Sequence, residues 1–311
     1  MASTIRRSNV ANVIRHVIHK RHIYVNTEGK IVFPLVNIFI VKGCNLKCEH
    51  CVSFNPFRHG MIPKEEVINT IRQWSERISP QTIALLGGEP LLHPDYQAIA
   101  IAARNTWKQS VVTIITNGLL LPKVQDDFLK RMVDHDIEFV VSRHINTENY
   151  NRSLSETIRR FQKFGVKYEM IESQKSWVTC HSLNTDGVPI SPNSNPTKSW
   201  THCLSKTCTT INNNQLYYCS VIFNMLQAVN EGSLPLVEFS GIAKHRFVTL
   251  DDSNKTILKY LRNSIPRECR FCLENFENIE AKQIPTEELK HIKLMITKMN
   301  NEFNTSGSNL I

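Results

Sequence analysis

The sequence predicts an α/β fold built on a parallel β-sheet, and three observations lead to this prediction. Runs of β-branched and other apolar residues, typical of strands buried on both faces, recur along residues 31–172. Amphipathic stretches with helical spacing separate these runs. Polar residues stand at the end of the runs, where the carboxyl edge of a parallel sheet places functional side chains.

The predicted elements alternate along the first half of the chain. Strands with their polar tips are expected at 31–41, 83–90, 111–118, 137–144 and 166–172. Helices are expected at 63–78, 94–107 and 122–135, and a fourth is expected to begin at a capping box at 153–156 and to end near Gly165. Because a helix follows nearly every strand, the strands are expected to run parallel.

A cysteine triplet follows the first predicted strand. Cys44, Cys48 and Cys51 have the spacing C-x3-C-x2-C. Three soft thiolates on one short loop suit an iron–sulfur cube and leave one iron free to bind a small molecule. A zinc knuckle would bring two C-x2-C pairs or added histidines. We expect no disulfide framework, because nine cysteines are an odd number and the sequence shows no signal peptide.

The triplet and three later motifs together resemble the signature of the radical S-adenosylmethionine (SAM) enzymes. The later motifs end the next three strands: Gly87-Gly88-Glu89-Pro90, Thr116-Asn117 and Ser142-Arg143. The resemblance implies that Cys44, Cys48 and Cys51 hold a [4Fe-4S] cluster whose open iron binds SAM, and that the later motifs contact SAM. It also implies that Glu89 binds the amino group of SAM. It also implies the partial (β/α)6 TIM-like barrel of this family over residues 30–175.

The second half of the chain carries the other cysteines. Cys203, Cys208 and Cys219 flank a predicted hairpin around residues 212–214, and Cys269 and Cys272 form a C-x2-C pair. This layout resembles the small α+β twitch domain, a reduced SPASM domain, and so implies an auxiliary [4Fe-4S] cluster. Cys219, Cys269 and Cys272 are the expected ligands, with either Cys203 or Cys208 as the fourth. Four thiolates would also suit zinc, which is the alternative.

Cys180 bears on the reaction. It follows the last predicted barrel strand and belongs to no metal-ligand spacing. As a catalytic hydrogen donor it would reduce a substrate radical and yield an epimer, whereas electron transfer to the auxiliary cluster would yield an oxidised product. A small buried hydrophobic residue is the structural alternative. The sequence therefore predicts a radical SAM oxidoreductase or epimerase and leaves the choice open.

Four parts of the chain are expected. They are a basic helical extension at 1–29, the partial barrel at 30–179, the auxiliary cluster domain at 180–280, and a C-terminal helix with a disordered tail at 281–311. The first 22 residues contain five basic residues and no acidic one. We expect an amphipathic helix there that packs across the barrel. Residues 182–199, rich in Ser, Asn, Pro and Thr, are expected to be an exposed linker or lid.

The composition of the chain limits which kinds of binding partner we expect. The formal net charge is +9, but no stretch interleaves aromatic and basic residues as nucleic-acid binding would require, and no apolar run is long enough to span a membrane. Cysteine usage predicts a reducing cytoplasm. We expect a small polar substrate, such as a carbohydrate, and a flavodoxin- or ferredoxin-type electron donor. The alternatives are modification of a ribosomal peptide, activation of a partner protein, and a non-catalytic iron–sulfur or zinc module.

Overall fold

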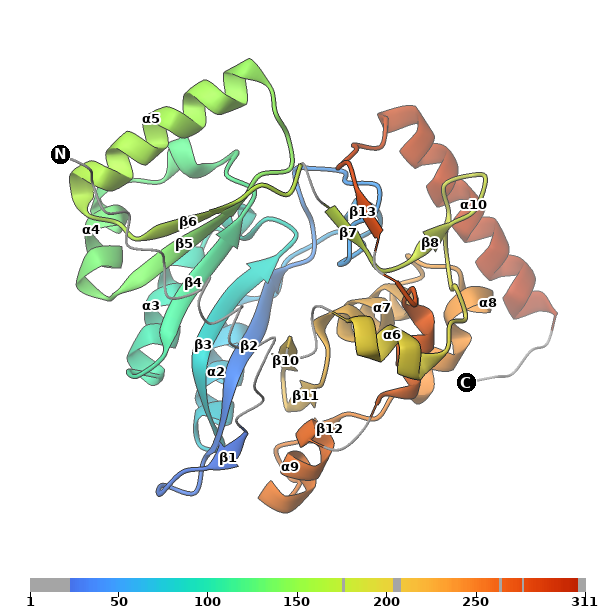
Figure 1. The fold of residues 1–311 in the computed structure, drawn as a ribbon, viewed down its shortest axis with the longest axis horizontal. Helices are drawn as coiled ribbons and strands as arrows, with labels where there is room; N and C mark the ends of the chain where they lie inside the picture. Colours follow the sequence, from blue (N-terminus) through green and yellow to red (C-terminus); the bar gives the residue numbers. More distant parts are fainter. Residues whose placement is uncertain (1–22, 175–176, 204–207, 263–264, 276, 307–311) are drawn as a thin grey trace.

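The computed structural model describes residues 23–174, 177–203, 208–262, 265–275 and 277–306 (Figure 1). The predicted helix in the first 22 residues lies outside these ranges. A nine-stranded sheet forms the centre of the described chain, and five of its strands are parallel and adjacent in chain order. These are β2 (Ile31–Val41), β3 (Ile78–Gly87), β4 (Val111–Thr116), β5 (Ile137–Ser142) and β6 (Tyr168–Ile171), with β1 (Tyr24–Val25) paired to β2. The predicted α/β class and parallel sheet are confirmed, as an open sheet consistent with a partial barrel.

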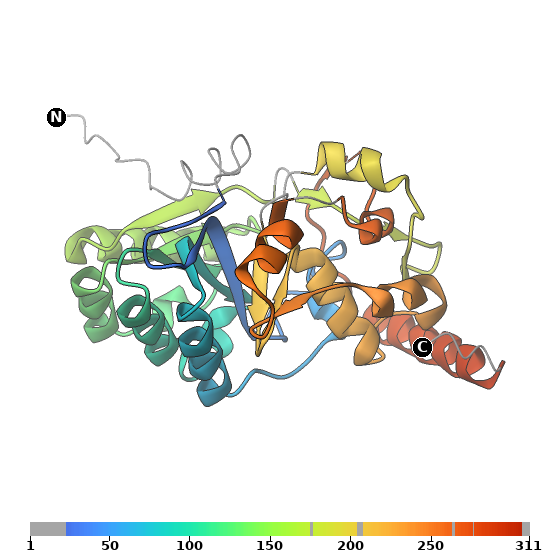
Figure 2. The ribbon, with the colours of Figure 1, turned by 90° about the horizontal axis from the view of Figure 1, so that it is seen from below.

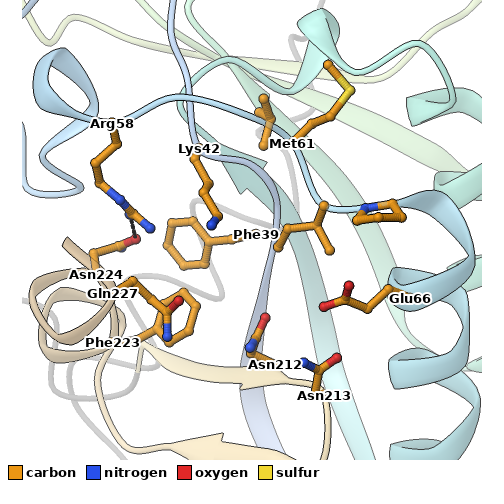
Figure 3. Close-up of a pocket in the computed structure, with 13 residues that line it drawn as sticks. Phe39, Lys42, Arg58, Met61, Glu66, Asn212, Asn213, Phe223, Asn224 and Gln227 are labelled. Carbon is orange, nitrogen blue, oxygen red and sulfur yellow. Dashed lines mark hydrogen bonds between the residues drawn. The ribbon is translucent and has the colours of Figure 1, made fainter. Parts of the chain in front are cut away.

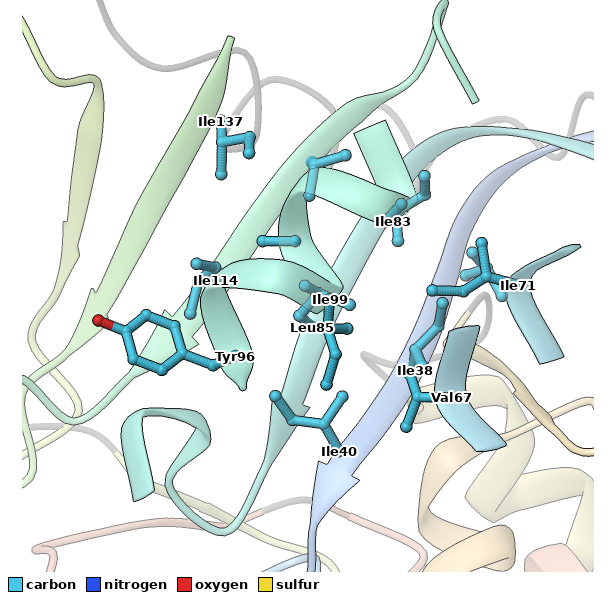
Figure 4. Close-up of a cluster of buried hydrophobic side chains, with 14 of the residues drawn as sticks. Ile38, Ile40, Val67, Ile71, Ile83, Leu85, Tyr96, Ile99, Ile114 and Ile137 are labelled. Atoms are coloured by element: carbon cyan, nitrogen blue, oxygen red, sulfur yellow. The ribbon is translucent and has the colours of Figure 1, made fainter. Parts of the chain in front are cut away.

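Helices connect the parallel strands and pack on one side of them (Figure 2). They are α2 (Lys64–Ser75), α3 (Tyr96–Thr106), α4 (Asp126–Asp134) and α5 (Glu148–Phe164). Alternate strand residues such as Ile38 and Ile83 meet helix residues such as Ile71 and Ile99 in one buried apolar cluster (Figure 4). This side of the sheet therefore carries the main core, and the carboxyl ends of the strands are left to carry polar side chains.

The predicted hairpin extends the same sheet. Strands β10 (Thr209–Asn212) and β11 (Gln215–Tyr217) pair antiparallel, and Asn213 has a φ of 50° in the turn, a conformation that asparagine tolerates. Strand β10 also pairs with β2 in parallel, and β12 (Val248–Thr249) follows β11. The hairpin is confirmed, and the sheet runs without a break from the predicted barrel into the predicted auxiliary domain. The domain boundaries themselves stay a prediction.

The second half adds a second core beside the sheet. Its elements are β7 (Trp177–Thr179), β8 (Ser182–Leu183), β9 (Pro189–Ile190), α6 (Pro196–His202), α7 (Ser220–Asn230), α8 (Leu236–Phe239), α9 (Asn254–Arg262), β13 (Glu277–Ile279) and α10 (Thr286–Thr305), with short 3-10 turns between some of them. Apolar residues of α7 and α10 pack there with Phe39 of β2 and with Phe54 and Phe57, which follow the cysteine triplet. The second core thus holds the segment after the triplet from one side.

Two local predictions were wrong. Helix α5 begins at Glu148, because Thr147 caps it by accepting a hydrogen bond from the Tyr150 N–H at 3.3 Å, so the supposed capping box lies inside the helix. It ends at Gly165 (φ 76°), as predicted. Helix α10 continues to Thr305 into the predicted disordered tail. Residues 182–199, which were predicted to be an exposed linker or lid, contain the β8–β9 pair and part of α6.

Candidate functional site

The predicted site residues lie on loops at the carboxyl edge of the sheet. We call residues 43–51 the cysteine loop. The backbone N–H of Gly88 donates to the carbonyl of Val41 at 3.0 Å, and the N–H of Glu89 donates to the carbonyl of Gly43 at 3.0 Å. A Cβ atom on Gly88 would lie 1.8 Å from that Gly43 oxygen. The space beside Gly88 is therefore filled by the backbone of the cysteine loop.

Glu89 joins two strand ends. Its side chain is fully buried, and both carboxylate oxygens accept hydrogen bonds from the end of β4. Oε1 accepts from the Thr116 hydroxyl at 2.7 Å, and Oε2 accepts from the Asn117 N–H at 2.8 Å. Burial raises the pKa of Glu89, and these bonds partly offset the rise. A ligand ammonium group would therefore have to use a remaining lone pair of the carboxylate or displace one of these donors.

Asn117 connects the end of β4 to the first cysteine of the cysteine loop. Its side-chain amide donates to Asn45 Oδ1 at 2.7 Å and lies 3.7 Å from the sulfur of Cys44. Its carbonyl accepts from the Tyr150 hydroxyl at 2.9 Å, which fixes the loop from the α5 side. The structure thus brings Glu89, Thr116 and Asn117 together with the cysteine loop, although 28 residues separate Glu89 from Asn117.

Each thiol of the triplet has a side-chain amide partner. Besides the Asn117–Cys44 contact, the Cys51 thiol donates to Asn55 Oδ1 at 3.1 Å, and Gln283 Nε2 donates to the Cys48 sulfur at 3.2 Å. Gln283 comes from the far end of the chain, and no motif or spacing in the sequence indicated it.

The triplet thiols are costly to ionise without a bound cation. Burial raises the pKa of Cys44 to about 12 and that of Cys51 to about 11, and it also raises the pKa of Cys48. The negative charges of neighbouring thiolates add to the rise for Cys44 and Cys51. A metal centre that binds thiolates would remove this cost by neutralising the charge.

Ser142 and Arg143 lie at the same edge but are engaged within the protein. The Ser142 hydroxyl pairs with that of Ser173 at 2.6 Å. One terminal nitrogen of Arg143 contacts both carboxylate oxygens of Glu172, at 2.7 and 2.9 Å, and the other donates to Asn151 at 2.6 Å. The guanidinium already binds a carboxylate of its own chain, so contact with a ligand carboxylate would require exchange.

The second group of cysteines also comes together. The sulfurs of Cys208 and Cys219 lie 3.8 Å apart, and the electrostatic influence of Cys203 and Cys272 reaches Cys219. Sharing one proton between Cys208 and Cys219 lowers the pKa of Cys208 to about 6 and raises that of Cys219. Burial and the nearby Cys272 raise the pKa of Cys269 to about 12. Cys208 therefore lies near all three expected ligands, and Cys203 lies near Cys219.

Cys180 lies beside this group, which its sequence position did not suggest. Its carbonyl accepts a hydrogen bond from the Leu273 N–H at 3.0 Å, and its buried thiol lies close enough to raise the pKa of Cys272. The next residue, His181, is fully buried, and its Nε2 has no hydrogen-bond partner within the described ranges. The His181 ring lies 5.6 Å, centroid to centroid, from that of His50 in the cysteine loop. The two cysteine groups are thus linked through Cys180 and His181.

A cavity of about 200 Å³ lies where the two halves of the chain meet (Figure 3). It lies between the end of β2, the start of α2, the β10–β11 turn and α7. Buried Arg58 pairs there with Glu231 at 2.9 Å and donates to Asn224 at 3.0 Å, and Lys42 pairs with Glu231 at 2.7 Å. Burial works to raise the pKa of Glu231, but the two cations outweigh it and lower the pKa. This network ties α7 to the residues that flank the cysteine loop.

Within the described ranges no two cysteines form a disulfide, and no three His, Cys, Asp or Glu side chains converge closely enough to hold a single metal ion. No helix within those ranges could cross a membrane.

Comparison with known proteins agrees with the motifs. Residues 38–173 match the Radical SAM superfamily, a span that runs from β2 past β6 and includes the cysteine loop. The GTP 3′,8-cyclase of Chlorobaculum tepidum is 30% identical over 126 residues, which cover 37% of this chain and 34% of that protein. Molybdenum cofactor biosynthesis protein 1 of Bos taurus is 29% identical over 124 residues, covering 35% and 19%. The chain thus spans about a third or less of these relatives.

Solved structures with a similar course of the chain were also found. BtrN in complex with AdoMet and 2-DOIA is 16% identical, and the match covers 80% of this chain and 98% of that chain with a TM-score of 0.46. Streptococcus suis SuiB bound to S-adenosylmethionine is 14% identical, with coverage of 76% and 68% and a TM-score of 0.32.

The superfamily implies a [4Fe-4S] cluster and SAM, and the residues present fit the cluster. Three free thiols stand on one loop, and thiolates are the ligands that iron–sulfur clusters take. Hydrogen-bond donors reach the sulfurs of Cys44 and Cys48. Such donors stabilise the charge that bound thiolates carry.

Proposed function

We propose that this chain is a radical SAM enzyme in which Cys44, Cys48 and Cys51 hold the SAM-binding [4Fe-4S] cluster. When bound, the cluster supplies the electron that cleaves SAM to a 5′-deoxyadenosyl radical, which abstracts hydrogen from a C–H bond of the substrate. The observation that carries the proposal is the convergence of the cysteine loop, the Glu89 turn and the Asn117 turn at one edge of the sheet, through bonds of 2.7–3.0 Å.

The protein's own residues have a positioning role in this proposal. The Glu89 carboxylate holds the end of β4 against the end of β3, and Asn117 then holds the start of the cysteine loop. We assign the binding of SAM to this edge, namely to Gly87, Gly88, Glu89, Pro90, Thr116, Asn117, Ser142 and Arg143. The buried Thr116 and Glu89 exclude water from the base of the site.

We further propose an auxiliary [4Fe-4S] cluster at the second cysteine group. The proximity of Cys219, Cys269 and Cys272 supports it. Of the two candidates for the fourth ligand, Cys208 influences the ionisation of all three thiols and Cys203 that of Cys219. The 3.8 Å between the sulfurs of Cys208 and Cys219 favours Cys208. It is also a spacing that two thiolates on one zinc ion can adopt, so the metal must be measured.

Cys180 has two possible roles. As a hydrogen donor it would make the enzyme an epimerase. The backbone hydrogen bond from Leu273 to Cys180, together with the influence of the Cys180 thiol on the pKa of Cys272, supports instead a place at the auxiliary metal centre, with oxidation as the reaction. Cys180→Ala separates the roles, because loss of a donor leaves the iron content unchanged while substrate hydrogen still exchanges. Loss of iron would assign Cys180 to the metal centre.

The proposed substrate is a small polar metabolite such as a carbohydrate. Modification of a ribosomal peptide and activation of a partner protein are the alternatives. The curated relatives do not decide among them, because this chain covers only a third or less of their length.

The test is metal analysis of anaerobically reconstituted protein, compared with the Cys44→Ala/Cys48→Ala/Cys51→Ala variant. We expect about eight irons in the wild type, about four in the variant, and loss of SAM cleavage to 5′-deoxyadenosine only in the variant. Zinc in place of iron in the variant would refute the auxiliary cluster, and it would favour a redox-neutral reaction such as epimerisation. Full SAM cleavage by the variant would refute the assignment of the triplet.

A further inference from the structure

The C-terminal part of the chain contacts the cysteine loop through a short antiparallel pairing. The N–H of Glu49 donates to the carbonyl of Lys282 at 3.0 Å, and the N–H of Ile284 donates to the carbonyl of Lys47 at 2.8 Å. Cys48 and Gln283 face each other in this pairing as an isolated β-bridge. More than 230 residues separate the two partners in sequence.

The side chain of Gln283 uses both ends of its amide in this contact. Its Oε1 accepts from the backbone N–H of Lys47 at 2.7 Å, which fixes the orientation of the amide. Its Nε2 therefore points at the sulfur of Cys48, at 3.2 Å. Gln283 itself is largely exposed, but Cys48 is only 8% exposed, so the bond reaches a sulfur that water hardly contacts.

The segment that carries Gln283 is firmly anchored. Ile284 is buried in the second core together with Leu289 and Ile292 of α10. Lys47 adds a further link, since its ammonium group donates to the Thr286 hydroxyl at 3.1 Å. The amide is therefore held at the sulfur by the packing of α10.

We propose that Gln283 is a positioning residue that raises the reduction potential of the cluster held by Cys44, Cys48 and Cys51. This inference rests on the proposed function. A hydrogen bond to a ligand sulfur withdraws electron density and stabilises the reduced cluster, which carries one more negative charge. The C-terminal segment, which follows the second cysteine group in the chain, thus influences how readily the first centre is reduced.

The test is an EPR-monitored redox titration of the reconstituted full-length protein, following the signal that changes when SAM is added. Gln283→Leu removes the donor and the acceptor without adding charge, whereas Gln283→Glu keeps an acceptor for the Lys47 N–H, removes the donor and adds a negative charge that also lowers the potential. Thr286→Val is the matched control, because it breaks a hydrogen bond of the same pairing that does not reach sulfur. Iron content and thermal unfolding are measured for every variant.

We expect both Gln283 variants to retain iron and to shift to a lower midpoint potential. The expected shift is about tenfold in the ratio of reduced to oxidised cluster at a fixed potential, or about 59 mV for one electron. Thr286→Val should titrate like the wild type. Unchanged potentials in both Gln283 variants, or an equal shift in Thr286→Val, would overturn the inference. A wild type that takes up no cluster at the triplet would instead refute the proposed function, and the inference with it.

Discussion

Two glycines that face each other across the site give a sharp test of how the cysteine loop is held. A Cβ atom at Gly88 would lie 1.8 Å from the Gly43 oxygen, 2.3 Å from the Gly43 carbonyl carbon and 2.8 Å from the Cys44 nitrogen. All three are backbone atoms and cannot rotate away. Gly88→Ala therefore requires the β3 turn and the cysteine loop to separate by more than about 1 Å.

The cost follows from the bonds at this contact. Separation breaks the hydrogen bonds from Gly88 N–H to Val41 and from Glu89 N–H to Gly43, each 3.0 Å long. Leaving two such buried pairs unsatisfied costs about 2–6 kcal/mol. Because Cys44 follows the displaced Gly43 carbonyl directly, the cysteine loop should also bind iron more weakly.

Gly43→Ala is the matched control, because a Cβ atom at Gly43 meets nothing within 4 Å. The assays are urea unfolding of the metal-free protein and iron content after anaerobic reconstitution. We expect Gly88→Ala to lose stability and at least half of the triplet's iron, and Gly43→Ala to keep both. Wild-type stability and iron in Gly88→Ala would refute the reasoning that this contact sets the position of the loop.

Three further predictions concern stability. Burial raises the pKa of Glu138 from 4.5 to about 7 against a weaker opposing effect of Lys167, so the folded chain holds this proton more tightly than the unfolded chain. Unfolding free energy should fall by about 3 kcal/mol between pH 4.5 and 7, and Glu138→Gln should remove most of this fall in urea titrations across that range. Glu231→Leu leaves buried Arg58 without its carboxylate and should destabilise the protein by about 3–5 kcal/mol, with Lys298→Leu, an exposed site, as control. The buried Thr113 hydroxyl has no hydrogen-bond partner among the described residues, so Thr113→Val should raise the unfolding free energy by about 1 kcal/mol, and a loss of stability would show that the hydroxyl is satisfied by water.

The order of strands and helices could be predicted because each element carries its own local signal. Strand β2 was predicted at its observed bounds, because a continuous run of apolar and β-branched residues is typical of a buried strand. The turn at Asn213 and the helix end at Gly165 were predicted because only certain residues adopt a positive φ. The start of α5 was missed because the sequence offers two possible capping residues, Thr147 and Ser153, within two turns of each other.

The sequence also indicated the chemistry proposed for the site, but it did not indicate which residues of the chain hydrogen-bond to the site residues. Cysteine spacing indicates an iron–sulfur centre because ligands close in sequence must share one loop. That Glu89 would bind Thr116 and Asn117, and that Arg143 would bind Glu172, depends on which strand ends lie side by side.

What the sequence determined by itself is therefore the class of fold and the superfamily motifs, because these depend on local patterns. Only the tertiary structure placed Gln283 on Cys48, Cys180 beside Cys272, and the β10–β11 hairpin on the edge of β2. Those contacts join segments tens to hundreds of residues apart. They depend on how the two cores pack against the sheet, which no pattern within one segment of the chain specifies.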